Sequence, residues 1–252
     1  VAPKETLYKR YILLGVGKED TLKPLGIEKA GGKLSGALLS CQAESCVIDV
    51  KGFPSYVGAH IGMGIKLANY KFTKYKTDKK SKEIKNLDVK IVSDDISDVQ
   101  ENFFPLKAEA EGIILARDLV NEPPNMLYPD SYAQIIKAEL KPLGVKVTIL
   151  DEKKMLKMGM GGIMAVGQAS VHQPRMVIME WMGSAEKSDK PLGFVGKGVT
   201  FDTGGISIKP PTDMDLMKMD MGGSAAVVGL MKSLALRKAK TNVVGVVGLV
   251  EN

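Results

Sequence analysis

Residues 195–226, VGKGVTFDTGGISIKPPTDMDLMKMDMGGSAA, place Lys197, Lys209, Asp202 and Asp220 among glycines and small residues. Asp202 follows an apolar run that predicts a buried strand, and Asp220 precedes a run that predicts a helix. Charged groups at the ends of buried elements cost free energy unless they are paired or bind a metal ion. This stretch is therefore the first candidate for a functional site.

The two carboxylates, if brought together, would repel each other unless a cation lay between them. Oxygen ligands of this kind bind hard divalent cations. Lys197 and Lys209 could polarise a carbonyl group or stabilise an oxyanion, and a desolvated lysine can be neutral and bind a metal. The residue types therefore indicate metal-assisted hydrolysis by one or two ions. The alternative is that the lysines and aspartates form structural ion pairs at strand ends.

Three other short motifs in the chain fail to meet the requirements of their classes. The D-T-G at Asp202 is typical of aspartic proteases, but no second copy is present to share its proton. The phosphate-binding loop needs Gly and Ser or Thr where this chain has Pro191 and Gly198. The glycines near Gly159 do not form the spacing of a dinucleotide-binding turn.

Strand and helix patterns alternate along the chain, which predicts an α/β fold with a parallel or mixed sheet. The strand ending at Val250 is almost entirely apolar, so we expect it to be central and covered on both faces. We expect strands at 11–16, 46–50, 87–92, 145–150, 176–181, 192–201 (interrupted by a bend at 196–198) and 242–250. We expect helices at 32–41, 55–69, 98–120, 129–140 (with Asp130 or Ser131 as N-cap), 151–158 and 224–236, and a flexible turn at 159–162.

Length and composition are those of a globular protein of one or two domains, 252 residues long with 44% hydrophobic residues. No apolar run is long enough for a transmembrane helix, and the N-terminal residues lack the order of a signal peptide, so we expect a cytoplasmic protein. We expect Cys41 and Cys46 to be reduced, mostly buried structural thiols. His60 and His172 are isolated, which favours structural roles over Ser-His or Cys-His catalysis.

The net charge of +6 comes largely from residues 71–90, where lysines alternate with a few acids. Nearby Tyr70, Phe72 and Tyr75 could indicate nucleic-acid contact. We favour a solvated connection between a helix and a strand instead.

The segments VGKGVTFDTGGISIKP and MDLMKMDMGGSAAV, with LARDLVNEPPNMLYPDSYA before them and VVGLVEN after them, resemble the leucyl aminopeptidase (cytosol aminopeptidase) family. The resemblance implies a partial N-terminal α/β domain at 1–97 and a linker helix at 98–122. It also implies the first part of an α/β zinc-peptidase-like catalytic domain, with a mixed central sheet, at 123–252.

The same resemblance implies a two-metal exopeptidase that removes N-terminal residues, often leucine, from peptides. It assigns Lys197, Asp202 and Asp220 as metal ligands, with Asp202 bridging both ions. Lys209 becomes the catalytic lysine, and Met217 lines the pocket for the N-terminal side chain. The implied ions are Zn or Mn, with Mg or Co as further candidates, and the implied assembly is a hexamer.

The family's Asn-Thr-Asp-Ala-Glu-Gly-Arg loop, with two more metal carboxylates, is not found in these residues. We therefore expect this chain to be an incomplete piece that is inactive alone, because few ligands give weak metal binding. The alternative function is a basic nucleic-acid-binding or structural protein with an unused peptidase-like core.

Overall fold

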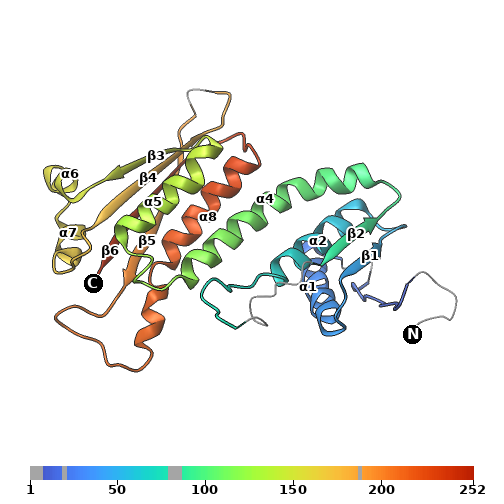
Figure 1. The fold of residues 1–252 in the computed structure, drawn as a ribbon. Coiled ribbons are helices and arrows are strands. Elements are labelled where there is room, and N and C mark those ends of the chain that lie inside the picture. The colour runs from blue at the N-terminus through green and yellow to red at the C-terminus, as the bar shows by residue number, and fades with distance from the viewer. Residues whose placement is uncertain (1–7, 19–21, 79–86, 187–188) are drawn as a thin grey trace. The chain divides into compact units, whose positions relative to one another are not determined.

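The computed structural model describes residues 8–18, 22–78, 87–186 and 189–252, in which helices alternate with strands (Figure 1). Contacts divide the chain into two units, residues 1–106 and 107–252. The division lies inside helix α4 (Ile96–Asn121), within the segment expected to link two domains. No helix in the described ranges is long and apolar enough to cross a membrane.

The N-terminal unit pairs two helices with a short parallel sheet. Its elements are α1 (Pro24–Ser40), β1 (Ser45–Asp49), α2 (Ser55–Ala68), β2 (Asp88–Val92) and the first turns of α4. Strands β1 and β2 are parallel, with Ser45 opposite Asp88. The core of this unit consists of buried aliphatic side chains from both helices, from β1 and from the residue after β1, namely Ile27, Leu34, Leu38, Ile48, Val50, Val57, Ile61 and Ile65.

The C-terminal unit is built on a mixed sheet with the strand order β3-β4-β6-β5. Strands β3 (Lys146–Leu150) and β4 (Arg175–Met182) are antiparallel, as are β4 and β6 (Asn242–Glu251), whereas β5 (Leu192–Phe201) runs parallel to β6. Strand β6 therefore lies inside the sheet, with Val247 and Leu249 fully buried. This confirms the expected mixed sheet and the central position of the last strand.

Helices α5 (Pro129–Leu140) and α8 (Gly222–Leu236) lie side by side against this sheet (Figure 1). Between helices and sheet lies a core that includes Tyr132, Met179 and Met231. The Tyr132 hydroxyl lies 3.0 Å from Ser224 Oγ, a contact that joins α5 to the start of α8, and burial raises the pKa of Tyr132. The unit also contains η2 (Lys141–Leu143), α6 (Glu152–Lys157), α7 (Gly161–Gly167) and η3 (Met214–Met219).

Several local expectations are wrong. Residues 11–16 have no regular structure, although an apolar run predicted a strand. Helix α1 begins at Pro24 rather than at residue 32, because proline is well suited to the first position of a helix. The N-cap of α5 is Tyr128 rather than Asp130 or Ser131, since Pro129 takes the first helical position and Ser131 Oγ accepts from Tyr128 N.

The glycine-rich segments also differ from expectation. Residues 161–167 form helix α7 where a flexible turn was expected at 159–162. Strand β5 runs without a bend through residues 196–198, because its pairing with β6 continues there.

Cys41 and Cys46 are free thiols but only half-buried. Lys79, Lys80 and Lys82, the centre of the basic segment, lie outside the described residues.

Candidate functional site

The site lies where β5 and β6 end. Asp202 is the first residue after β5, and Asn252 is the first after β6. Asn252 N donates to Phe201 O at 3.0 Å, and Thr203 N donates to Asn252 O at 2.8 Å, so the two strand ends stay paired beyond the sheet. Parallel strands present their carboxyl ends at one edge, and ligand sites of α/β folds lie at such edges.

Strand β5 contains a β-bulge just before Asp202. Lys197 pairs with Gly248 and Val199 with Val250, but Phe201 pairs with Glu251, so β5 has one residue more than β6 over this stretch. Successive strand residues point to opposite faces, so residues 197 and 202 would normally diverge. One extra residue at Thr200 shifts this alternation by one position, which would bring the two side chains to the same side.

Thr200 itself is buried, and its hydroxyl donates to Val250 O at 3.2 Å. This bond gives the hydroxyl group a partner at the bulge and also holds β5 to β6. The bulge therefore belongs to the packed part of the sheet rather than to a frayed end.

The Asp202 carboxylate accepts three hydrogen bonds. Its Oδ1 accepts from Gly204 N at 3.0 Å and from Asn252 Nδ2 at 2.8 Å, and its Oδ2 accepts from Lys209 Nζ at 2.8 Å. The bond from the Lys209 ammonium contributes most to lowering the pKa of Asp202, and the Asn252 amide and the Gly204 amide add to it against an opposing effect of burial. Asp202 is therefore an anion at neutral pH.

Lys209 returns to Asp202 because the chain turns back at two glycines. Gly204 and Gly205 have φ values of +90° and +63°, a region that suits glycine. Lys209 N then donates to Thr203 O at 2.8 Å, which closes the turn. The Lys209 ammonium also lies 3.2 Å from Met217 Sδ, so the turn meets η3.

Asp220 follows η3 and is bound to Lys197. Lys197 Nζ donates to Asp220 Oδ1 at 2.7 Å, although the lysine side chain is 62% exposed and the aspartate only 23%. Asp220 Oδ2 is buried and has no hydrogen-bond partner among the residues that the structure describes. A buried carboxylate oxygen without a partner costs free energy, and one reason for such a position is an ion that binds there.

The donor set fits a divalent cation as part of a coordination shell. Two carboxylates and a lysine amine are suitable ligands, and Asp220 Oδ2 is an oxygen still available to bind. Lys197 would have to release its proton to become a ligand, since here it donates to Asp220. Within the described ranges, no group of three or more His, Cys, Asp and Glu residues is placed to hold a metal ion.

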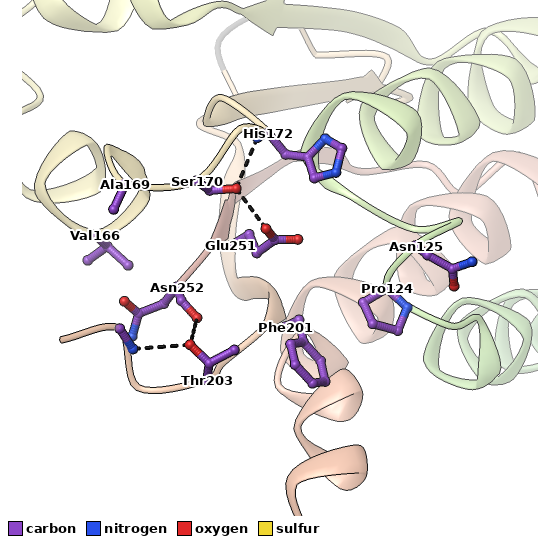
Figure 2. Close-up of a pocket in the computed structure, with 11 residues that line it drawn as sticks. Pro124, Asn125, Val166, Ala169, Ser170, His172, Phe201, Thr203, Glu251 and Asn252 are labelled. Atoms are coloured by element: carbon purple, nitrogen blue, oxygen red, sulfur yellow. Dashed lines mark hydrogen bonds between the residues drawn. The ribbon is translucent and has the colours of Figure 1, made fainter. Parts of the chain in front are cut away.

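A cavity of about 510 Å³ lies beside the turn that follows Asp202. Thr203, Gly205 and Asn252 line one side of it, and Figure 2 shows Ser170 and Glu251 across from Thr203. Ser170 Oγ donates to Glu251 Oε1 at 2.7 Å. His172 lines the same cavity and stacks on Tyr128 with ring centroids 4.2 Å apart, whereas His60 lies 2.8 Å from Glu28 in the other unit.

The structure brings the five predicted site residues into two contacting groups. Asp202, Lys209 and Met217 form one, and Lys197 with Asp220 forms the other. The groups are connected through the chain, because Asp220 N donates to Met217 O at 3.3 Å and β5 contains Lys197 and is followed directly by Asp202. Whether these residues bind metal or substrate stays a prediction.

Sequence reasoning missed Asn252, although a signal for it was present. Like Asp202, it directly follows a largely apolar strand, and the two strands were both expected in the sheet, although β5 lies at the sheet edge and is partly exposed. Side chains at the carboxyl ends of neighbouring parallel strands meet, so Asn252 was a candidate neighbour of Asp202.

The comparison with known families identifies both units. The catalytic domain of the cytosol aminopeptidase family matches residues 114–252, and the N-terminal domain of the same family matches residues 1–79. This chain belongs to the cytosol aminopeptidase family. A probable cytosol aminopeptidase of Afipia carboxidovorans is 45% identical over 258 residues, which cover 100% of this chain and 51% of that protein. The chain thus spans about half the length of the curated family members it matches.

Solved structures of similar proteins confirm the α/β peptidase fold expected for a cytosol aminopeptidase. The bottromycin maturation enzyme BotP, in complex with Mn, superposes with a TM-score of 0.80 at 28% identity, over 95% of this chain and 50% of that one. A variant of tomato leucine aminopeptidase superposes with a TM-score of 0.80 at 24% identity, over 93% of this chain and 46% of that one, and supports the fold alone.

Proposed function

We propose that this protein takes part in releasing N-terminal residues, leucine-like ones in particular, from peptides by two-metal-assisted hydrolysis. The observation that carries the proposal is the pairing of each aspartate with a lysine at the end of β5 and at η3, with Met217 against Lys209. Membership of the cytosol aminopeptidase family agrees with this chemistry.

Asp202, Asp220 and Lys197 are the residues that would hold the metal ions, with Asp202 shared between them. Zn or Mn are the first candidates, and Mg or Co would suit the same oxygen and amine ligands. Bound ions would supply Lewis acidity and a water nucleophile active at neutral pH. The Mn bound in the BotP structure supports a divalent ion of this class.

Lys209 would act on the scissile carbonyl group of the peptide. Its ammonium donates to Asp202 here, and the same donor could turn to a carbonyl oxygen and stabilise the negative charge that develops on it. Met217 offers a flexible apolar thioether next to that ammonium, which suits the side chain of an N-terminal leucine. Specificity for leucine-like residues would follow from this contact.

The described residues alone supply few ligands for two ions. Two carboxylates and one amine give weak and labile metal binding, because each missing ligand weakens the site. We therefore propose that this chain has little hydrolytic activity by itself. We further propose that the active protein is a homo-oligomer, a hexamer. Light scattering from the peak eluted in size-exclusion chromatography would measure its mass.

A chimera tests the proposed activity. This chain would replace the matching residues of the Afipia carboxidovorans protein, and hydrolysis of Leu-p-nitroanilide would be followed with Mn or Zn. We expect metal-dependent turnover, and we expect Lys209→Ala to lower it by at least about 100-fold. Lys190→Ala, at an exposed position outside the site, is the matched control. A folded chimera that keeps full activity with Lys209→Ala would contradict the proposal.

A further inference from the structure

Asn252 contacts four residues of the segment that carries Asp202. Its backbone N donates to Phe201 O, and its backbone O accepts from Thr203 N at 2.8 Å and from Thr203 Oγ1 at 2.9 Å. Its side-chain Oδ1 lies against Gly205, where an added Cβ would come within 2.7 Å of it. Figure 2 shows Asn252 and Thr203 joined in this way at the cavity wall.

The side-chain amide of Asn252 makes one further bond, to Asp202 Oδ1 at 2.8 Å. Together with Gly204 N, it gives Oδ1 two donors, whereas within the described ranges Oδ2 accepts from the Lys209 ammonium alone. A carboxylate oxygen has two lone pairs, so Oδ1 is fully used and Oδ2 has one left. The carboxylate is thus asymmetric, with a fixed side and an available side.

We propose that Asn252 is a positioning residue for Asp202. Its amide holds Oδ1, fixes the plane of the carboxylate, and leaves Oδ2 beside Lys209 as the oxygen that a divalent cation would bind. The proposal rests on the proposed function in one respect, that Asp202 is a metal ligand. Groups that orient a metal ligand in this way commonly matter for affinity even though they do not touch the ion.

The backbone bonds of Asn252 would form with any residue at this position, so a substitution isolates the amide. Asn252→Ala removes the bond to Asp202 and leaves the pairing with Phe201 and Thr203. Thr203→Val is the matched control. It removes the bond from Thr203 Oγ1 to Asn252 O between the same two segments, and the bond from Gly205 N to Thr203 Oγ1 within the turn, but leaves the amide on Asp202. Asn252→Ala therefore tests the orientation of the Asp202 carboxylate, and Thr203→Val tests the attachment of the turn to Asn252.

The test measures Mn²⁺ affinity of the 252-residue chain by electron paramagnetic resonance of free Mn²⁺, alongside urea unfolding. We expect Asn252→Ala to weaken Mn²⁺ binding by about 10- to 100-fold and Thr203→Val by less than about threefold, at similar unfolding midpoints. Unchanged Mn²⁺ binding in Asn252→Ala would overturn the proposal, and so would an equal loss in Thr203→Val.

A second measurement keeps the two proposals distinguishable. If the unsubstituted chain binds no Mn²⁺, the metal part of the proposed function fails for this chain, and crystal structures of the chain and of Asn252→Ala decide the positioning role. We expect the Asp202 carboxylate to rotate in the variant and its Oδ2 to leave Lys209 Nζ. A carboxylate that keeps its plane and its 2.8 Å contact would overturn the role of Asn252.

Discussion

The two aspartates of the site differ in how well their oxygen atoms are satisfied. Asp202 receives three hydrogen bonds, and each of its oxygens has at least one donor. Asp220 receives one from Lys197, and its other oxygen is buried without a donor from the described part of the chain. A fully bonded carboxylate is held in place, whereas a partly bonded one is costly and is the better candidate to gain a cation.

Removing the charge of Asp220 should cost metal affinity and little stability. Asp220→Asn keeps an oxygen for Lys197 but removes the anion that would attract a cation. We expect Mn²⁺ affinity to fall by at least about tenfold. The free energy of unfolding should change by no more than about 1 kcal/mol, because its lysine partner is largely exposed.

Isothermal titration calorimetry and urea unfolding would measure both quantities. Asp215→Asn, at an exposed position in η3, removes the same charge nearby and should leave the affinity within about twofold. Equal Mn²⁺ affinity in Asp220→Asn and the unsubstituted chain would count against Asp220 as a ligand.

The ion pair of Asp202 has a consequence for pH dependence. The pKa of the Asp202 carboxyl group is lowered in the folded chain, and the hydrogen bond from Lys209 is the largest cause. The stabilisation is therefore fully present above the ordinary pKa of an aspartate and is lost as the pH falls through the lowered value. Lys209→Met should raise the pKa of Asp202 and reduce this loss of stability in acid.

Carbon NMR of the Asp202 carboxyl group, titrated from neutral to acidic pH, would measure that shift directly. Lys218→Met is the control, because Lys218 donates to Asn121 O instead of to an aspartate. An Asp202 titration midpoint that does not move in Lys209→Met would show that the ammonium is not what holds the carboxylate ionised.

At the scale of elements, the site depends on the sheet edge and on one irregularity in it. The ends of β5 and β6 were predictable, because apolar runs of strand length precede both Asp202 and Asn252. The bulge at Thr200 was not predictable, since it depends on the register between two strands distant in sequence. The bend expected at residues 196–198 assigned the irregularity to glycines, but pairing with β6 keeps those residues extended.

Contacts between segments distant in sequence also account for the other elements that differ from the sequence-based expectation. The apolar residues 11–16 satisfied a local strand pattern, but a strand needs a partner, and these residues pair with none of the described strands. Helix α7 contains Gly161, Gly162 and Gly167, so its composition argued against a helix, yet Ile163 packs near Gly248 of β6. Tertiary contacts overrode weak local preferences in both cases.

Deleting Thr200 would test the bulge as the device that aligns Lys197 with Asp202. Regular pairing would then extend to the end of β5, and Asp202 would move to the opposite face. We expect the deletion to lower Mn²⁺ affinity by more than about 100-fold and to cost about 1–3 kcal/mol of stability, because Thr200 is buried.

Thr200→Val is the control of equal length, since it removes the hydroxyl bond to Val250 O but keeps the extra residue. Its Mn²⁺ affinity should stay within about tenfold of the unsubstituted chain. If the deletion variant folds and binds Mn²⁺ as well as Thr200→Val, the bulge does not orient Asp202.

At the scale of the whole molecule, the chain has two separate cores. Ile27 and its neighbours form one in residues 1–106, and Tyr132, Met179 and Met231 belong to the other in residues 107–252. The site described above lies entirely in the second unit. Because each unit buries its own apolar residues, each is expected to unfold as a cooperative unit of its own.

One tryptophan makes this expectation measurable. Trp181, the only tryptophan of the chain, lies in β4 of the second unit and donates to Ala239 O at 2.9 Å. Its fluorescence reports that unit alone, whereas circular dichroism at 222 nm reports the helices of both. Ile27→Ala creates a cavity at a fully buried position of the first core and should cost that unit about 2–5 kcal/mol.

In urea, Ile27→Ala should therefore move a transition seen by circular dichroism to lower concentration and leave the Trp181 fluorescence midpoint in place. Met231→Ala, which opens an equally buried position in the other core, should do the reverse and lower the fluorescence midpoint. A fluorescence midpoint that follows Ile27→Ala as closely as Met231→Ala would mean that the two units unfold together. Independent midpoints would instead show that a destabilised first unit leaves Asp202, Lys209 and Asp220 in a folded second unit.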